Sequence, residues 1–150
     1  MTRINAFINP KTLTDQHLLA EYKEINQLCG QYANSLYKQG RGVIPPSFRL
    51  GTGHVSFFLD KGWWLASRFA LVREEMIQRK FKTEQQFNMK VWDRSDFNHW
   101  CPKDEEIKLA KKLLTERISE RILESKVEPR YYGKVETRES AVRRIRKNLK

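Results

Sequence analysis

Apolar residues recur at spacings of three and four over residues 15–39, which is the periodicity of one buried helix face. Thr14 or Asp15 can cap this helix by accepting hydrogen bonds from its first free backbone amides. Gly40 and Gly42 follow the pattern and disfavour its continuation. The sequence therefore predicts a long first helix. Its apolar positions are Leu18, Leu19, Tyr22, Ile25, Leu28, Cys29, Tyr32 and Leu36.

The same periodicity returns over residues 60–81 and again over residues 103–126, which predicts two further helices. Asp60 is the expected cap of the second helix, and Pro102 directly precedes the third. The first turn of the third helix holds three acids, Asp104–Glu106, which suits the positive end of the helix dipole. The apolar positions of the third helix are Ile107, Leu109, Leu113, Leu114, Ile118, Ile122 and Leu123.

The remaining segments have no strand periodicity. Residues 2–11 form a short arm, and residues 41–58 form a loop rich in glycine and proline. Within that loop, residues 51–54 ("GTGH") predict either a close approach to DNA or a turn that starts a helix. Residues 82–103 are irregular, and their aromatic side chains are expected in the core. The fold class is all-α: one compact domain of about three main helices with long loops.

The net positive charge of the chain adds to this fold prediction, because it indicates a negatively charged partner. The chain has 29 basic and 18 acidic residues, a formal net charge of +11 and a pI near 9.8. An excess of this size over 150 residues favours a polyanionic partner, and nucleic acid is the first candidate. The alternative is a protein that is basic for other reasons. Residues 127–150 begin as a loop and end in a basic stretch, expected as a short helix or as a phosphate-contacting arm that is disordered when free.

Cysteine and histidine are too scattered to indicate a metal site. Cys29 and Cys101 lie far apart, as do His17, His54 and His99, so we expect free thiols, no metal and no cofactor. The sequence has no apolar run of the roughly 18 residues that a membrane span needs and no targeting segment. We therefore expect a monomer in the cytoplasm, or in the host cytoplasm if the protein is viral, with no membrane contact.

The second residue carries a candidate nucleophile. Thr2 has a small side chain, so methionine removal is expected to make it the first residue. An α-amino group has a reference pKa near 7.7–8.0, against about 10.4 for lysine, so a fraction of it is the free amine at neutral pH. A free amine can attack an electrophilic carbon and form an imine. Most chain termini, however, have no chemical role.

Two carboxylates on the first helix could support such chemistry. Glu21 and Glu24 are three residues apart and therefore lie on adjoining positions of one face. A carboxylate beside an amine can shuttle protons and stabilise a developing sugar cation. His17 and Lys23 lie nearby and could hold phosphate. All four residues could equally form a solvated helix face.

Four separated segments together resemble one known family. "MTRIN", "DQHLLAEYKEI", "GTGHVSFFLDK" and "YYGK" occur in the order found in the pyrimidine-dimer DNA glycosylases of the phage endonuclease V type. The resemblance runs from Met1 to Lys134. It implies a compact helical protein whose N-terminal arm threads between helices. It also implies a DNA repair glycosylase with AP-lyase activity, acting on the 5′ base of a cyclobutane pyrimidine dimer in double-stranded DNA.

The resemblance assigns roles to individual residues. It implies that the α-amino group of Thr2 attacks the sugar C1′, forming an imine that leads to β-elimination, and that Glu24 is the catalytic glutamate. Arg3 and His17 match residues that hold DNA near the lesion. Lys23 stands where the family has an arginine and keeps the charge without the bidentate fork. Further DNA contacts are expected at Gln27, Arg117, Tyr131, Tyr132 and Lys134.

The chain departs from the family pattern in four more places. Gln27 or Asn26 replaces an arginine one turn after Glu24, which bears on lesion choice. The loop before "GTGHV" is shorter, and "KVEPR" replaces an aromatic segment. Sixteen residues follow "YYGK", so we divide the chain into a glycosylase-like domain over 1–134 and a basic extension over 135–150. Two alternatives to a pyrimidine-dimer glycosylase stay open: the same chemistry on another lesion, and DNA binding without catalysis. The presence of Thr2 together with Glu24 argues against mere binding.

Overall fold

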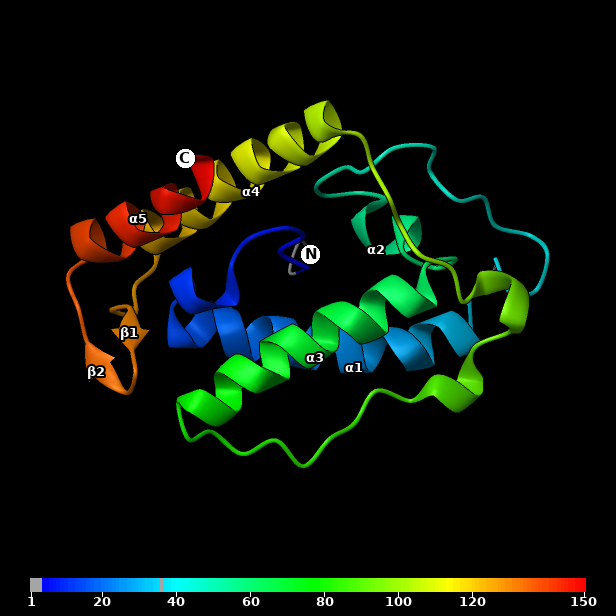
Figure 1. The fold of residues 1–150 in the computed structure, drawn as a ribbon, viewed down its shortest axis with the longest axis horizontal. Helices are drawn as coiled ribbons and strands as arrows, with labels where there is room; N and C mark the ends of the chain where they lie inside the picture. Colours follow the sequence, from blue (N-terminus) through cyan, green and yellow to red (C-terminus); the bar gives the residue numbers. More distant parts are fainter. Residues whose placement is uncertain (1–3, 36) are drawn as a thin grey trace.

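The computed structural model describes residues 4–35 and 37–150 and is built mainly from helices, which confirms the predicted all-α class. The helices are α1 (Asp15–Ala33), α2 (His54–Phe57), α3 (Gly62–Gln78), α4 (Asp104–Glu124) and α5 (Arg138–Arg146). A small antiparallel hairpin joins β1 (Arg130–Tyr131) to β2 (Lys134–Val135). Figure 1 shows α1 and α3 side by side, with α4 facing them across the N-terminal arm. Within the described residues, no helix is both long and apolar enough to cross a membrane.

The arm passes through the interior of the protein, as the family resemblance implies (Figure 1). Ile4, Ala6 and Ile8 have no exposed surface. Phe7 adopts a left-handed backbone conformation with φ of 65°, which costs about 1–2 kcal/mol for a residue with a side chain. In this conformation its ring lies 4.9 Å from that of Trp100, centroid to centroid. Burial of the arm therefore fixes its path.

The two predicted helix caps have different outcomes. Thr14 is the N-cap of α1, and its hydroxyl oxygen accepts from the backbone amide of His17 at 3.1 Å. Asp60 does not cap α3: the N-cap is Lys61, which makes no side-chain capping bond. The Asp60 carboxylate instead pairs with the Lys61 ammonium at 2.7 Å. That local ion pair keeps Asp60 from the amides of α3.

Helix α1 ends at Ala33 rather than at the predicted Gln39. The next two side chains bind carbonyl groups of the last turn, Asn34 through its amide nitrogen at 3.2 Å and Ser35 through its hydroxyl at 2.7 Å. Asn and Ser side chains compete in this way with backbone hydrogen bonds and end helices. The apolar pattern continues past this point, so periodicity alone placed the boundary too late.

The aromatic residues of the irregular segment pack into the core, as predicted. The Trp92 ring is 8% exposed and stacks on Tyr32 with centroids 4.1 Å apart. The Tyr32 hydroxyl donates to the Asp96 carboxylate at 2.6 Å. This segment therefore covers one end of α1.

The C-terminal segment is ordered, which corrects the expectation of an arm that is disordered when free. Thr137 caps α5 by accepting from the backbone amide of Ser140 at 3.2 Å. Ala141, Val142 and Ile145 are buried where α5 packs against α4. The sequence prediction for this segment considered only its basic residues and did not recognise these three apolar positions. Their spacing gives the short helix a core-facing side. Part of the extension over 135–150 thus belongs to the hydrophobic core.

Candidate active site

Two adjacent backbone amides anchor the start of the described arm. The Ile4 N–H donates to Nε2 of His54 at 3.3 Å, and the Asn5 N–H donates to Oε2 of Glu21 at 3.1 Å. The Asn5 side-chain amide donates to the other Glu21 oxygen at 3.0 Å. Thr2 and Arg3 lie outside the described residues.

Glu21 is a structural carboxylate with its hydrogen-bonding capacity occupied. Arg68 on α3 donates to both of its oxygens, through Nε at 2.7 Å and through Nη2 at 2.9 Å. The third guanidinium nitrogen of Arg68 donates to the Ile8 carbonyl at 2.8 Å. Glu21 is fully buried and Arg68 is 5% exposed. Sequence reasoning paired Glu21 with Glu24 as proton carriers, but the ion pair with Arg68 assigns Glu21 to holding the arm.

Glu24 is buried without such a partner. It follows Glu21 by one helical turn and is 8% exposed. Among residues 4–35 and 37–150, no hydrogen bond or ion pair engages its carboxylate. A buried carboxylate is costly unless a donor or a cation satisfies it. Of the two glutamates, Glu24 is therefore the one whose carboxylate no other described residue engages.

His54 is a second anchor that sequence reasoning did not identify as a site residue. Its Nδ1 lies 2.9 Å from the Arg49 carbonyl, so Nδ1 carries the proton and Nε2 accepts from Ile4. Burial lowers the pKa of this histidine. His54 begins α2 directly after Gly53, whose φ of 89° is left-handed. Of the two interpretations of "GTGH", the start of a helix is confirmed.

A cavity of about 360 Å³ lies between α1 and α4. It brings His17 together with Arg117, as the predicted DNA contacts require, and adds Arg121, which the sequence analysis missed. Arg121 follows Arg117 by four residues, so helical spacing carried the signal. The Nε of Arg117 is buried and has no hydrogen-bond partner in the described part of the chain. An unsatisfied guanidinium donor in a cavity suits an anion such as a phosphate.

His17 enters this cavity as a neutral group. Burial, together with the positive charge of Arg121, lowers the pKa of His17 to about 4. Its Nδ1 lies 2.8 Å from the Thr14 hydroxyl. His17 is therefore uncharged at neutral pH, and the positive charge of the cavity comes from the arginines.

The side chains of Lys23 and Gln27 are exposed on α1, flanking the buried Glu24. Asn26, the other residue considered for the arginine position, is engaged. Its amide nitrogen donates to the Tyr22 carbonyl at 3.1 Å and to the Gln85 side chain at 2.9 Å. Gln27 is therefore the residue at this position that faces solvent beside the candidate site.

The "YYGK" segment forms the turn of the hairpin, and Asp15 holds it. Tyr132 and Gly133 both have positive φ, 53° and 79°, and their backbone amides donate to the two Asp15 oxygens at 3.1 and 2.8 Å. Asp15 also accepts from Arg79 at 2.9 Å. Lys134 is exposed on β2. The position of the hairpin therefore depends on the first residue of α1.

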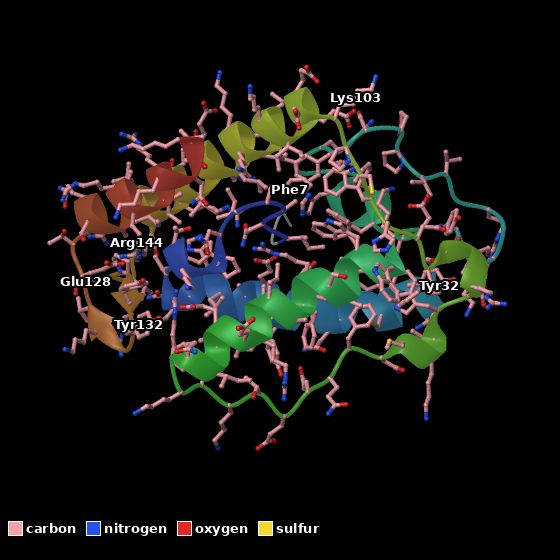
Figure 2. All side chains as sticks on the ribbon, in the orientation of Figure 1. Phe7, Tyr32, Lys103, Glu128, Tyr132 and Arg144 are labelled. Atoms are coloured by element: carbon pink, nitrogen blue, oxygen red, sulfur yellow. The ribbon has the colours of Figure 1, made fainter. Side chains whose placement is uncertain are left out.

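The two tyrosines of this turn pack on cations. The Arg144 guanidinium lies 3.6 Å from the Tyr131 ring centroid, and Figure 2 labels Arg144 and Tyr132 at this end of the molecule. The Tyr131 hydroxyl donates to the Lys11 carbonyl at 2.9 Å, and the Tyr132 hydroxyl donates to Glu75 at 3.0 Å. These contacts give both tyrosines a structural role. Their contact with DNA stays a prediction.

No cluster of three or more metal-ligating side chains occurs within residues 4–35 and 37–150. In a comparison with known protein families, the family model described as pyrimidine dimer DNA glycosylase matches residues 1–89. The matched part contains the arm, both glutamates of α1, His54 and the Arg68 that pairs with Glu21.

Proposed function

Because this chain belongs to the pyrimidine dimer DNA glycosylase family, we propose that it uses the Thr2 α-amino group as its nucleophile and Glu24 as its catalytic carboxylate. The observation that supports this most strongly is the difference between the two glutamates of α1. Glu21 is saturated by Arg68 and Asn5 and holds the arm, whereas Glu24, one turn further, is buried without a partner among the described residues.

The proposed reaction proceeds in two stages. The amine attacks C1′, a C1′–N bond forms, and the glycosidic bond breaks so that the base leaves with the electron pair and takes up a proton. Opening of the C1′–O4′ bond then gives the imine and a hydroxyl group at C4′. The imine withdraws electrons, so a base removes a C2′ proton and the C3′–O bond breaks, which cleaves the strand. Glu24 accepts the amine proton and stabilises the positive charge that develops on the sugar.

Binding of duplex DNA relies on the basic surface around this site. In the proposal, Arg117 and Arg121 bind a phosphate in the cavity between α1 and α4, with His17 as a neutral hydrogen-bonding partner. The proposal also has Arg3, Lys23 and Gln27 contact the DNA strand near the lesion. An enzyme that acts on C1′ must extrude nucleotides from the duplex, and a damaged pair lowers that cost. The protein acts as a monomer, in the cytoplasm, without a cofactor.

Cleavage of three end-labelled duplexes tests this function: one with a single cyclobutane thymine dimer, one with an abasic site, and one undamaged. We expect strand cleavage at the dimer and at the abasic site and none in the undamaged duplex. Cleavage at the abasic site alone would support the second candidate, the same chemistry on a different lesion. The exposed Gln27 at the position of a family arginine is the observation that favours that candidate. No cleavage of any duplex would contradict the proposal.

A further inference from the structure

The ring of His54 cannot turn away from the arm. It has no exposed surface, and two aromatic rings meet it edge to face, Phe48 with centroids 5.6 Å apart and Phe58 with centroids 5.5 Å apart. The hydrogen bond from Nδ1 to the Arg49 carbonyl fixes its orientation and its tautomer. The single remaining acceptor, Nε2, points at the Ile4 amide. His54 is therefore a rigid acceptor for one backbone group.

The position of that backbone group gives the contact its significance. Ile4 N–H is two residues from the proposed nucleophile, and the next amide, Asn5 N–H, is held by Glu21 from the opposite side, on α1. Two consecutive amides bound to two rigid side chains fix the position of the backbone at residues 4 and 5. Further along the arm, which Figure 2 labels at Phe7, the Phe7 ring packs against the rings of Trp100 and Trp64, with centroids 4.9 and 6.1 Å apart.

We infer that His54 is a positioning residue of the glycosylase reaction: by accepting the Ile4 N–H at Nε2, it holds the arm so that the Thr2 amine reaches the sugar C1′. This inference rests on the proposed function, in which Thr2 is the nucleophile. A reacting group that moves by 1 Å can lose about 100-fold in rate. Loss of the His54 contact should therefore slow imine formation while DNA binding, which uses the cationic side chains, is preserved.

The contact requires a neutral imidazole. A proton on Nε2 would place an N–H against the Ile4 N–H, two donors facing each other, and the anchor would be lost. The negative charge of Glu21 on α1 acts to raise the pKa of His54, and Arg68 pairs with this carboxylate. The Arg49 carbonyl, from the loop before α2, binds Nδ1 of His54. Burial opposes protonation and keeps the anchor in place at neutral pH.

The test compares His54→Leu with His54→Gln. Leucine removes the acceptor, whereas the glutamine side-chain oxygen can accept from Ile4 and does not titrate. Single-turnover trapping of the imine on an abasic-site duplex with cyanoborohydride gives the rate, and titration of the same duplex gives the affinity. We expect His54→Leu to trap about 100-fold more slowly with affinity within about twofold of wild type. His54→Gln should keep a rate within a few-fold of wild type.

Two controls separate positioning from stability. Ile145→Ala, in the core between α4 and α5, lowers stability without removing the His54–Ile4 hydrogen bond and should leave the trapping rate unchanged. His99→Leu, at an exposed histidine, should have no effect. If His54→Leu does not fold, the pH dependence of His54→Gln decides. In acid, the wild-type rate should fall more steeply with proton concentration than the His54→Gln rate, because His54 protonates only in the wild-type protein.

Unchanged trapping by His54→Leu, or identical acid limbs for wild type and His54→Gln, would overturn the inference. Failure of the proposed function has a different signature, because wild-type protein itself would then give no adduct at its N-terminus. In that case both the nucleophilic role of Thr2 and the positioning role of His54 would be rejected.

Discussion

Arg68 on α3 donates to both carboxylate oxygens of Glu21 on α1, at 2.7 and 2.9 Å, in a pair that is almost fully buried. The same two oxygens accept from the backbone and side chain of Asn5 in the arm. The ion pair thus joins three segments and fixes the arm beside Glu24. Two glutamates one helical turn apart consequently have different tasks, the first in holding the chain and the second in the proposed chemistry.

Glu21→Gln should destabilise the fold strongly. The substitution leaves the buried Arg68 charge without its partner, and breaking a buried pair in this way costs about 3–5 kcal/mol. Urea unfolding gives the free energy of unfolding of the variant and of wild type. Glu24→Gln is the matched control, because it removes a carboxylate from the same helix without breaking an ion pair between described residues. Equal stability of the two variants would contradict the structural role of Glu21.

Glu24→Gln should abolish turnover and preserve binding. A general acid–base group typically contributes about 10²–10⁴ in rate, and the amide can neither take up a proton nor stabilise a sugar cation by charge. Cleavage of the dimer-containing duplex under single-turnover conditions measures the rate, and a binding titration measures affinity. Glu120→Gln, an exposed acid on α4, should behave as wild type. Full-rate cleavage by Glu24→Gln would remove this residue from the mechanism.

The exposed basic residues of α5 and the turn after it should contact DNA phosphates. Arg143, Arg146 and Lys147 lie along one side of this segment, over a groove against α4. Replacing all three by alanine should weaken binding and reduce the slope of log K against log salt by up to about 3, since each phosphate contact contributes about 0.9. Deleting residues 135–150 would be a poorer test, because the deletion also removes buried Ala141 and Ile145.

Arg144→Ala provides the control for this prediction. Arg144 is turned inward, where it forms an ion pair with Glu136 at 2.6 Å and packs on Tyr131. Its loss should lower stability and leave the salt slope unchanged. A triple variant with the wild-type salt slope would exclude α5 from the DNA interface.

Stability should fall in acid because of His17. The folded pKa is about 4, below the unfolded value of about 6.5, so the unfolded chain binds more protons between these values and stability rises with pH across that window. Acidification from pH 6.5 to pH 4 should remove about 3 kcal/mol through this group. Urea unfolding of wild type and His17→Gln over this range measures the difference. Parallel curves for the two proteins would show that His17 does not titrate as the structure implies.

Local patterns in the sequence predicted the parts of the fold that depend on neighbouring residues. The three long helices, the Thr14 cap and the acidic first turn of α4 follow from periodicity and capping chemistry. The arm between the helices was expected from the family resemblance. Asn34 and Ser35, which end α1, are also local signals, but the apolar pattern beyond them concealed their effect.

The missed features depend on pairs that are distant in sequence. Arg68 lies within the apolar face of α3, where a charge indicates a buried partner, yet nothing in the sequence identifies Glu21 as that partner. His54 was not identified as an anchor, because its acceptor role depends on Ile4, fifty residues earlier. The hairpin of "YYGK" is too short to show alternation, and the Asp15 carboxylate that stabilises it belongs to a different segment.

Imine trapping on the lesion itself tests whether the Thr2 amine is the nucleophile. Wild-type protein with its initiator methionine removed is incubated with a duplex that carries one cyclobutane thymine dimer, in the presence of borohydride, and the adduct is mapped by peptide mass spectrometry. Protein that retains Met1 serves as the control, because its amine is displaced by one residue. We expect a covalent adduct on the α-amino group of Thr2 and little adduct with the control. An adduct on a lysine side chain such as Lys23, or no adduct with either the dimer or an abasic-site duplex, would contradict it.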